Sequence, residues 1–144
     1  MTGFKKIFFD TSPFIYLLED HQNYSVPVRN FIVDEYLVFE SSLLTSTITY
    51  AEFFVKPKAN GDQALIEKFK NKIKEFHFKV FDITAQIAEF SCDLRVAYQF
   101  LKTADALQLA TAISCGSNKF LTNDYQLKRI KEIEVITIED LIKP

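Results

Sequence analysis

Several residue types that build common active sites are scarce in this 144-residue chain, which has no tryptophan, two histidines, two cysteines and three glycines. With only Gly3, Gly61 and Gly116 available, neither a P-loop nor a GxGxxG dinucleotide loop can form. His21 and His77 lie far apart and neither has a partner at helical spacing. A histidine-built zinc site or a Ser/His/Asp triad therefore has little to start from.

The two cysteines also form no recognisable site. Cys92 and Cys115 lie in helical-looking segments without a CxxC pair, so we expect buried free thiols rather than a disulfide or a zinc knuckle. The first residues, MTGFKK, lack the basic and apolar stretches of a leader, and no window is apolar enough to span a bilayer. These features predict a cytoplasmic protein that does not associate with membranes.

Positive charge is not in excess, because the formal net charge is -2 and the pI is about 5.7. This balance does not indicate nucleic-acid binding through bulk positive charge. Lysines do cluster locally, in KFKNKIK (68–74) and in LKRIK (127–131). These clusters are either solvated helix faces or a basic rim around an acidic centre, and the sequence leaves both interpretations open.

What the chain does contain is typical of one globular domain covering residues 1–144. Hydrophobic residues make up 48% and charged residues 25%, which argues against disorder and against a fibrous protein. Fifteen phenylalanines accompany the absence of tryptophan. Since phenylalanine has no polar group that needs a partner, we expect these rings to fill the core.

Predicted strands and helices alternate along the chain. The apolar run Ile7 to Phe9 predicts a buried strand at 5–9, and short strands are also predicted at 43–46, 78–81, 119–122 and 135–138. Helical spacing predicts helices at 14–19, 26–37 and 63–76, one through TYAEFFVK that ends at Pro57, and two more between the third and fourth strands. This alternation predicts a three-layer α/β/α sandwich with a mostly parallel sheet.

Helix starts carry capping residues. Ser12 precedes Pro13 and is predicted to cap the first helix. Asp62, Thr84 and Thr103 are predicted to cap later helices. The first strand, however, ends directly at an acid, Asp10, and the carboxyl ends of parallel strands are where binding sites form.

Four acids lie at such positions. Asp10 follows the first strand, Glu52 lies in the helix after the second, and Asp124 follows the strand KFLT. Asp105 is the only charged residue in TADALQLATAISCG, a helix neutral enough to be buried. We predict that these four carboxylates converge at one edge of the sheet.

Each acid also has a structural explanation. Asp124 could cap a helical turn, Asp10 could support the turn that follows it, and Asp105 is favoured near a helix N-terminus by the helix dipole. Glu52 lies three residues after Thr49, as in a capping box.

Taken together, the four acids favour a metal site. Four carboxylates at one edge would repel one another unless a cation lay between them. Mg²⁺ and Mn²⁺ prefer oxygen ligands, and the lack of nearby histidine and cysteine disfavours zinc or copper. Such a cation suits phosphate chemistry, because it activates water and neutralises charge on phosphate oxygens.

Four blocks of the sequence, in this order, carry a resemblance to a known family: FFDTSPFIYLLE, STITYAEFF, LKTADALQLATAI and KFLTNDYQL. The chain resembles the PIN-domain nucleases, and within them the VapC-like toxins of toxin–antitoxin pairs. The resemblance covers nearly the whole chain. It implies that Asp10, Glu52, Asp105 and Asp124 are the catalytic acids that hold Mg²⁺ or Mn²⁺.

The resemblance has further implications. Thr11 and Ser12 match hydroxyl positions that orient a ligand or water in similar proteins, and Asn123 flanks the last acid. A PIN-like sheet of about five parallel strands is implied, as are a homodimer and an antitoxin whose tail occupies the acidic pocket. The implied activity is endonucleolytic cleavage of single-stranded RNA to 5′-phosphate and 3′-hydroxyl ends.

Other functions remain open at this point. The same domain could act as a stand-alone PIN nuclease in RNA processing. Haloacid-dehalogenase-like phosphatases and receiver domains also place an aspartate after the first strand, but the former require D-x-D where this chain has Asp10-Thr11-Ser12. The latter require an acidic pair that is missing before Asp10. In a non-catalytic interaction domain the four acids would serve only as caps.

Overall fold

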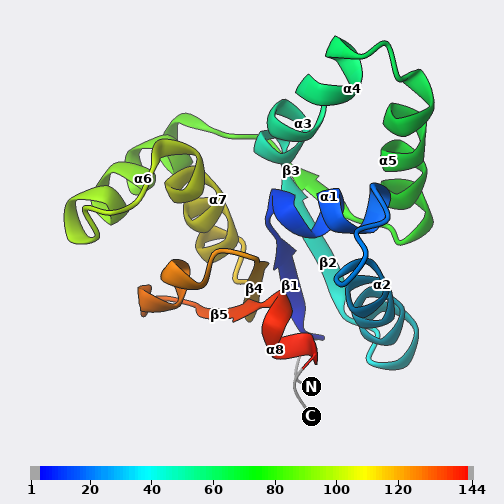
Figure 1. Ribbon diagram of the computed structural model, residues 1–144. Helices are drawn as coiled ribbons and strands as arrows, with labels where there is room; N and C mark the ends of the chain where they lie inside the picture. Colours follow the sequence, from blue (N-terminus) through cyan, green and yellow to red (C-terminus); the bar gives the residue numbers. More distant parts are fainter. Residues whose placement is uncertain (1–3, 143–144) are drawn as a thin grey trace.

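A five-stranded parallel sheet forms the centre of the protein, for which a computed structural model describes residues 4–142 (Figure 1). The strand order is β3-β2-β1-β4-β5, and every neighbouring pair is parallel. The strands are β1 (Lys6–Phe9), β2 (Ser42–Ser46), β3 (Lys79–Phe81), β4 (Lys119–Thr122) and β5 (Glu134–Thr137). Each lies within one residue of its predicted range, and the predicted three-layer α/β/α architecture is confirmed.

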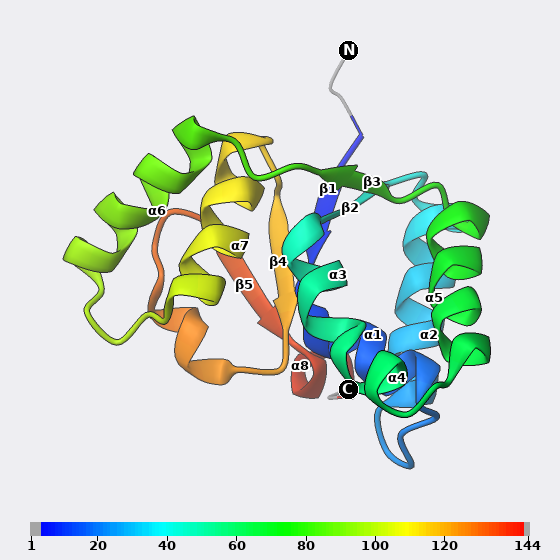
Figure 2. The same ribbon diagram turned by 90° about the horizontal axis from the view of Figure 1, so that it is seen from above.

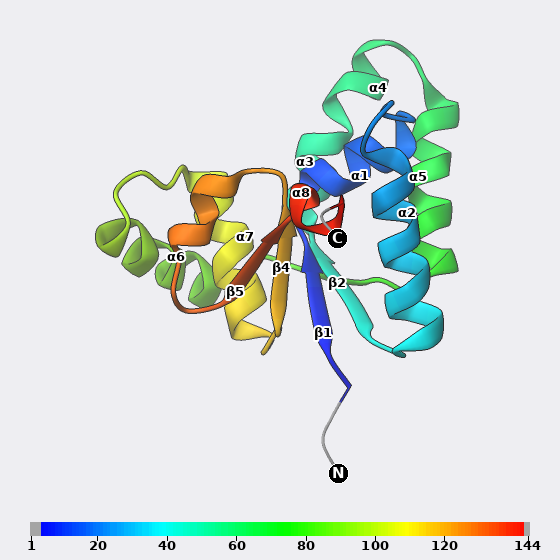
Figure 3. The ribbon, with the colours of Figure 1, turned by 60° about the horizontal axis from the view of Figure 1, so that its bottom comes forward.

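Helices cover both faces of the sheet (Figure 2). One face carries α1 (Thr11–Leu18), α2 (Ser25–Val33), α3 (Thr47–Phe53) and α5 (Gln63–Glu75), and Figure 3 shows α2 and α5 side by side. The other carries α6 (Ala85–Ala97) and α7 (Thr103–Ser114). Shorter segments are the π-helical η1 (Asp34–Val38), α4 (Val55–Ala59), the 3₁₀ segment η2 (Tyr125–Arg129) and α8 (Ile138–Ile142). None of the helices in residues 4–142 has the length and apolarity needed to cross a bilayer.

The two sides of the sheet have separate phenylalanine-rich cores. Because side chains alternate along a strand, Phe9 packs with the α1, α2 and α5 layer, whereas Phe8 packs with the α6 and α7 layer. Phe8 stacks on Phe120 of β4 with ring centroids 5.5 Å apart. Phe69 of α5 is fully buried, and its ring lies 5.3 Å from that of Phe14. The expected role of phenylalanine as a core residue is confirmed at these positions.

Some local predictions are wrong. The first helix begins at Thr11, so Asp10 caps it and Ser12 lies inside. Pro57 does not end a helix but lies within α4, in its first turn, where its missing N–H costs no helical hydrogen bond. Thr103 is the first residue of α7, whose N-cap is Lys102.

The cysteines and the last helix also differ from expectation. Cys92 is exposed and Cys115 is half-buried, although both are free thiols as predicted. The helical turn α8 directly after β5 was not predicted, because the apolar run VITI continues across the boundary between strand and helix. In contrast, the predicted caps Asp62 and Thr84 accept hydrogen bonds from Leu65 N and Ile87 N.

The strand order determines where a site can form. From β1 the chain proceeds to β2 and β3 on one side, and then returns to β4 on the other side of β1. In open parallel sheets a crevice forms at such a reversal, outside the carboxyl ends of the strands. Asp10 directly follows β1, and Asp124 lies two residues after β4.

Candidate active site

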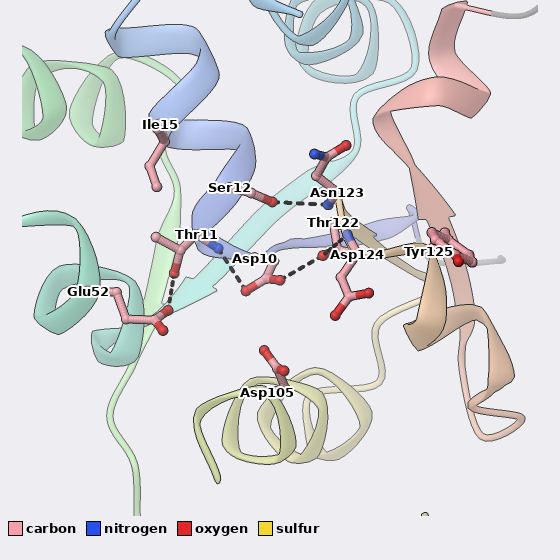
Figure 4. Close-up of a pocket in the computed structure, with 10 residues that line it drawn as sticks. All are labelled: Asp10, Thr11, Ser12, Ile15, Glu52, Asp105, Thr122, Asn123, Asp124 and Tyr125. Carbon is pink, nitrogen blue, oxygen red and sulfur yellow. Dashed lines mark hydrogen bonds between the residues drawn. The ribbon is translucent and has the colours of Figure 1, made fainter. Parts of the chain in front are cut away.

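A cavity of about 550 Å³ opens at the carboxyl ends of β1 and β4 (Figure 4). The four acids predicted from the sequence all line it, although they come from segments far apart in the chain. So do the three neighbouring residues that the resemblance singled out. The complete lining is Asp10, Thr11, Ser12, Ile15, Glu52, Asp105, Thr122, Asn123, Asp124 and Tyr125.

Asp10 lies deepest of the four acids, with 8% of its surface exposed. Its Oδ1 accepts a hydrogen bond from Thr11 N at 2.8 Å, and its Oδ2 accepts one from Thr122 Oγ1 at 2.8 Å. Burial raises the pKa of this carboxyl from 3.8 to about 6, against the lowering effect of these two hydrogen bonds. The nearby charges of Asp105 and Glu52 raise it further.

Glu52 enters the pocket from α3. Its Oε1 accepts a hydrogen bond from the Thr11 hydroxyl at 2.5 Å, which ties α3 to the start of α1. The alternative explanation of Thr49 and Glu52 as a capping box does not hold, because α3 begins at Thr47 and is capped by Ser46, whose Oγ accepts from Ile48 N. Freed from capping, the Glu52 carboxylate is available to the pocket.

Asp105 lies in the first turn of α7 and points toward the Asp10 carboxylate (Figure 4). The side chain is half-buried, and burial raises its pKa above the ordinary value of 3.8. The charges of Asp124 and Glu52 act in the same direction, whereas Lys102 opposes them. The charges of neighbouring pocket acids therefore make both Asp10 and Asp105 harder to ionise.

Asp124 is exposed, like Glu52, and has a structural role as well. It caps η2 through a hydrogen bond from Gln126 N to its Oδ1 at 3.0 Å. Its own backbone N–H donates to Thr122 Oγ1 at 3.1 Å, and that hydroxyl donates in turn to Asp10. Thr122 thus connects the first and last of the acids.

The remaining predicted residues hold the loop after β4 in place. Ser12 Oγ accepts a hydrogen bond from Asn123 N at 3.0 Å, so α1 and the β4 loop are joined at the rim of the pocket. Asn123 donates through its side-chain amide to the Tyr16 hydroxyl at 2.7 Å. These contacts fix the segment that carries Asp124.

In the part of the chain that the structure describes, no basic side chain forms an ion pair with these carboxylates. Within residues 4–142 the ion pairs are Lys56–Glu19, Lys72–Glu75 and Lys128–Asp140, none of which involves a pocket acid. An all-oxygen donor set without a basic partner fits a hard divalent cation in its chemistry. In the described part of the chain, however, no three His, Cys, Asp or Glu side chains are grouped closely enough to form a preassembled metal site.

Sequence reasoning missed some residues of the site. Thr122 contacts Asp10 directly, yet as a threonine at the end of a strand it gave no functional signal. Gln108 is 0% exposed and is the one large polar side chain at the buried face of α7. Its position three residues after Asp105, in an otherwise neutral helix, could have indicated a buried polar contact near the site.

A parallel α/β sheet with carboxylates around the crevice at its strand reversal defines an α/β protein with an acidic candidate site. The chain belongs to the PIN domain family, whose model matches residues 7–133. This match confirms the resemblance found in the sequence. No curated protein matches the chain.

Solved structures of toxins and of toxin–antitoxin complexes have a similar fold. VapBC2 from Rickettsia felis, solved with a promoter DNA fragment, gives a TM-score of 0.74 at 18% identity, covering 92% of this chain and 98% of that one. A toxin–antitoxin complex from Klebsiella pneumoniae gives 0.67 at 25% identity, with 92% and 97% covered. VapC20 from Mycobacterium tuberculosis, described as cleaving the sarcin–ricin loop, gives 0.68 at 14% identity, with 88% and 98% covered.

Proposed function

We propose that this protein is a Mg²⁺- or Mn²⁺-dependent endoribonuclease that hydrolyses phosphodiester bonds in single-stranded RNA. The observation that carries the proposal is the convergence of Asp10, Glu52, Asp105 and Asp124 from four segments into one cavity, where none of them forms an ion pair with a basic side chain of residues 4–142. Burial, and to a smaller extent the charges of neighbouring carboxylates, raises the pKa values of Asp10 and Asp105, and a bound cation would favour the ionised form of both.

The four acids would hold the cation through their carboxylate oxygens. A bound cation of this kind lowers the pKa of a coordinated water and neutralises charge that develops on the phosphate. The chain's own hydroxyl groups do the orienting. Thr11 fixes the Glu52 carboxylate, Thr122 fixes Asp10, and Ser12 fixes the backbone of Asn123 beside Asp124.

The rim of the cavity favours a nucleic-acid strand as the substrate. Tyr125 lines the cavity with 74% of its surface exposed, so its ring is free to stack on a base. Lys102 is exposed at the start of α7, close enough to lower the pKa of Asp105, and can contact a phosphate. These local groups compensate for the absence of bulk positive charge.

We further propose that the protein is the toxin of a type II toxin–antitoxin pair, acting in the cytoplasm as a homodimer that an antitoxin inhibits. The support is that the structures similar to this chain include toxin–antitoxin complexes. Expression in a bacterial host should arrest growth, and the product of an adjacent small gene should relieve the arrest and copurify with the chain. Growth arrest without such a partner would favour a stand-alone PIN nuclease.

The activity itself is tested with Asp105→Asn, which keeps the shape of the side chain and removes its charge. We expect cleavage of single-stranded RNA in Mn²⁺ or Mg²⁺, loss of cleavage in EDTA, and a loss of about 100-fold or more in the variant. Asp93→Asn, the same change at an exposed site on α6, is the matched control and should retain full activity. Equal cleavage by the Asp105 variant and the wild type would exclude the proposal.

A further inference from the structure

A buried series of hydrogen bonds lies beneath the acidic cavity and links α7, α3 and β1. Gln108 Nε2 donates to Thr49 Oγ1 at 2.9 Å, Thr49 Oγ1 contacts Thr45 Oγ1 at 2.8 Å, and Thr45 Oγ1 donates to the Phe9 carbonyl at 2.8 Å. We call this series the Gln108 relay. Its three side chains are all 0% exposed, so no water can substitute for a missing partner.

The direction of each hydrogen bond in the relay follows from counting protons. The single hydroxyl proton of Thr45 is committed to the Phe9 carbonyl, so Thr49 must donate to Thr45. Thr49 then has only lone pairs left for Gln108, which must present its NH₂ group there. The amide oxygen of Gln108 accepts from Ser46 Oγ, the residue that caps α3. The Gln108 amide cannot flip, and the hydroxyl groups cannot rotate, without leaving buried donors or acceptors unpaired.

The relay connects three segments that each carry a pocket acid. Gln108 follows Asp105 by one turn of α7, and Thr49 precedes Glu52 by one turn of α3. The Phe9 carbonyl belongs to the residue before Asp10. In addition, the Thr11 hydroxyl that donates to Glu52 lies 3.5 Å from Thr49 Oγ1.

From this geometry we propose that Gln108 and Thr49 are positioning residues that set the separation of Asp10, Glu52 and Asp105. The inference rests on the proposed function, in which these acids hold the cation. Apolar side chains of similar size would fill the same volume, but they would leave α7 and α3 free to shift against β1. Directed hydrogen bonds remove that freedom because only one relative placement satisfies all of them. Partners that orient metal ligands in this way commonly contribute about 10- to 100-fold to metal affinity.

Thr49→Val tests the proposal, because valine keeps the shape of threonine and removes the hydroxyl. We expect the Mn²⁺ dissociation constant of the full-length chain, measured by electron paramagnetic resonance of free Mn²⁺, to rise about 10-fold. The kcat for an RNA oligonucleotide should fall while its KM changes little. Thr49→Ser restores the hydroxyl and should recover both values, and Gln108→Met should reproduce the defect.

Thr111→Val is the matched control. Thr111 is also 0% exposed and lies one turn beyond Gln108 on α7, but its hydroxyl donates to the Leu107 carbonyl of its own helix. This variant should lose some thermal stability and keep the wild-type Mn²⁺ affinity and kcat. If Thr49→Val and Thr111→Val bind Mn²⁺ alike, or if Gln108→Met loses only stability, the relay has a structural role alone and the proposal is wrong.

Crystal structures grown in EDTA separate failure of this inference from failure of the proposed function. A wild-type chain that neither binds Mn²⁺ nor cleaves RNA would overturn the nuclease proposal. The positioning role of the relay would still be tested by comparing the crystal structures of the wild type and Thr49→Val. In the variant, Glu52 should lose its contact with Thr11 and move relative to Asp105. An unchanged Glu52 would overturn the positioning role whatever the activity.

Discussion

Asp10 and Asp124 each cap a helical segment and line the acidic cavity at the same time. Capping and function looked like competing explanations for these residues in the sequence. They are compatible because a carboxylate has two oxygens with about four acceptor sites, and a cap uses only one or two of them. In Asp124, for example, Oδ1 receives the Gln126 N–H, which leaves the lone pairs of Oδ2 available to a ligand.

The raised pKa of Asp10 predicts a specific dependence of stability on pH. The pKa of its carboxyl is about 6 in the folded chain, compared with the ordinary value of 3.8 that applies to the unfolded chain. The folded state therefore binds the proton more tightly than the unfolded state. The stabilising effect of this proton is complete below pH 3.8 and is lost as the pH rises through 6. The loss amounts to about 3 kcal/mol, since one pKa unit corresponds to about 1.4 kcal/mol.

Asp10→Asn isolates this effect, because asparagine also caps helices well and carries no charge. In EDTA, the free energy of unfolding of the variant relative to wild type should increase between pH 4 and pH 7 by about 3 kcal/mol, as measured by urea denaturation. The difference between two chains removes the contribution of other titrating groups. A difference that stays constant over this range would show that Asp10 ionises normally.

Capping at the start of α6 gives a prediction at the scale of one element. Thr84 Oγ1 accepts from Ile87 N and has no contact with the cavity. Thr84→Ala should lower the free energy of unfolding by about 1 kcal/mol, because one N–H at the helix start loses its partner. Cleavage and Mn²⁺ binding should be unchanged. A 10-fold or larger loss of activity would mean that activity falls with any loss of stability, so that losses in the site variants could not be assigned to the carboxylates themselves.

The elements themselves were largely predictable from sequence, whereas contacts between them were not. Short stretches rich in apolar residues located all five strands, most clearly β1, whose Ile7, Phe8 and Phe9 are buried because helices cover both faces of the sheet. Thr49 and Glu52 do not form a capping box because both side chains have partners outside their helix. Thr49 bonds Gln108, 59 positions away, and Glu52 bonds Thr11, 41 positions away. Spacing within a segment carries no information about such contacts.

The positions of the acids were predicted better than their surroundings. Asp10 and Asp124 follow strands, and Glu52 and Asp105 lie in helices, all at the carboxyl edge of the sheet, where the parallel topology brings them together. The contact of Thr122 with Asp10 depends on the register of β4 against β1, and the Gln108 relay depends on the registry of α7 and α3 against the sheet. That registry is set by core packing, which composition and periodicity do not specify.

At the scale of the whole molecule, a ligand that binds only the folded chain must stabilise all of it. At a Mn²⁺ concentration 100-fold above its dissociation constant, the free energy of unfolding should rise by about 2.7 kcal/mol. Thermal denaturation with and without Mn²⁺ measures this shift, which should disappear in Asp105→Asn and persist in Asp93→Asn. Identical melting curves for the wild type in Mn²⁺ and in EDTA would argue against a cation at the cavity.

The central strand β1 is made early, but its neighbour β4 begins only at Lys119. A ribosome must therefore synthesise every residue from Asp10 to Asp124 before these two acids can meet. Until then the nascent chain lacks one wall of the cavity, and the proposed cleavage cannot take place. The order of the strands thus makes the proposed activity wait for β4.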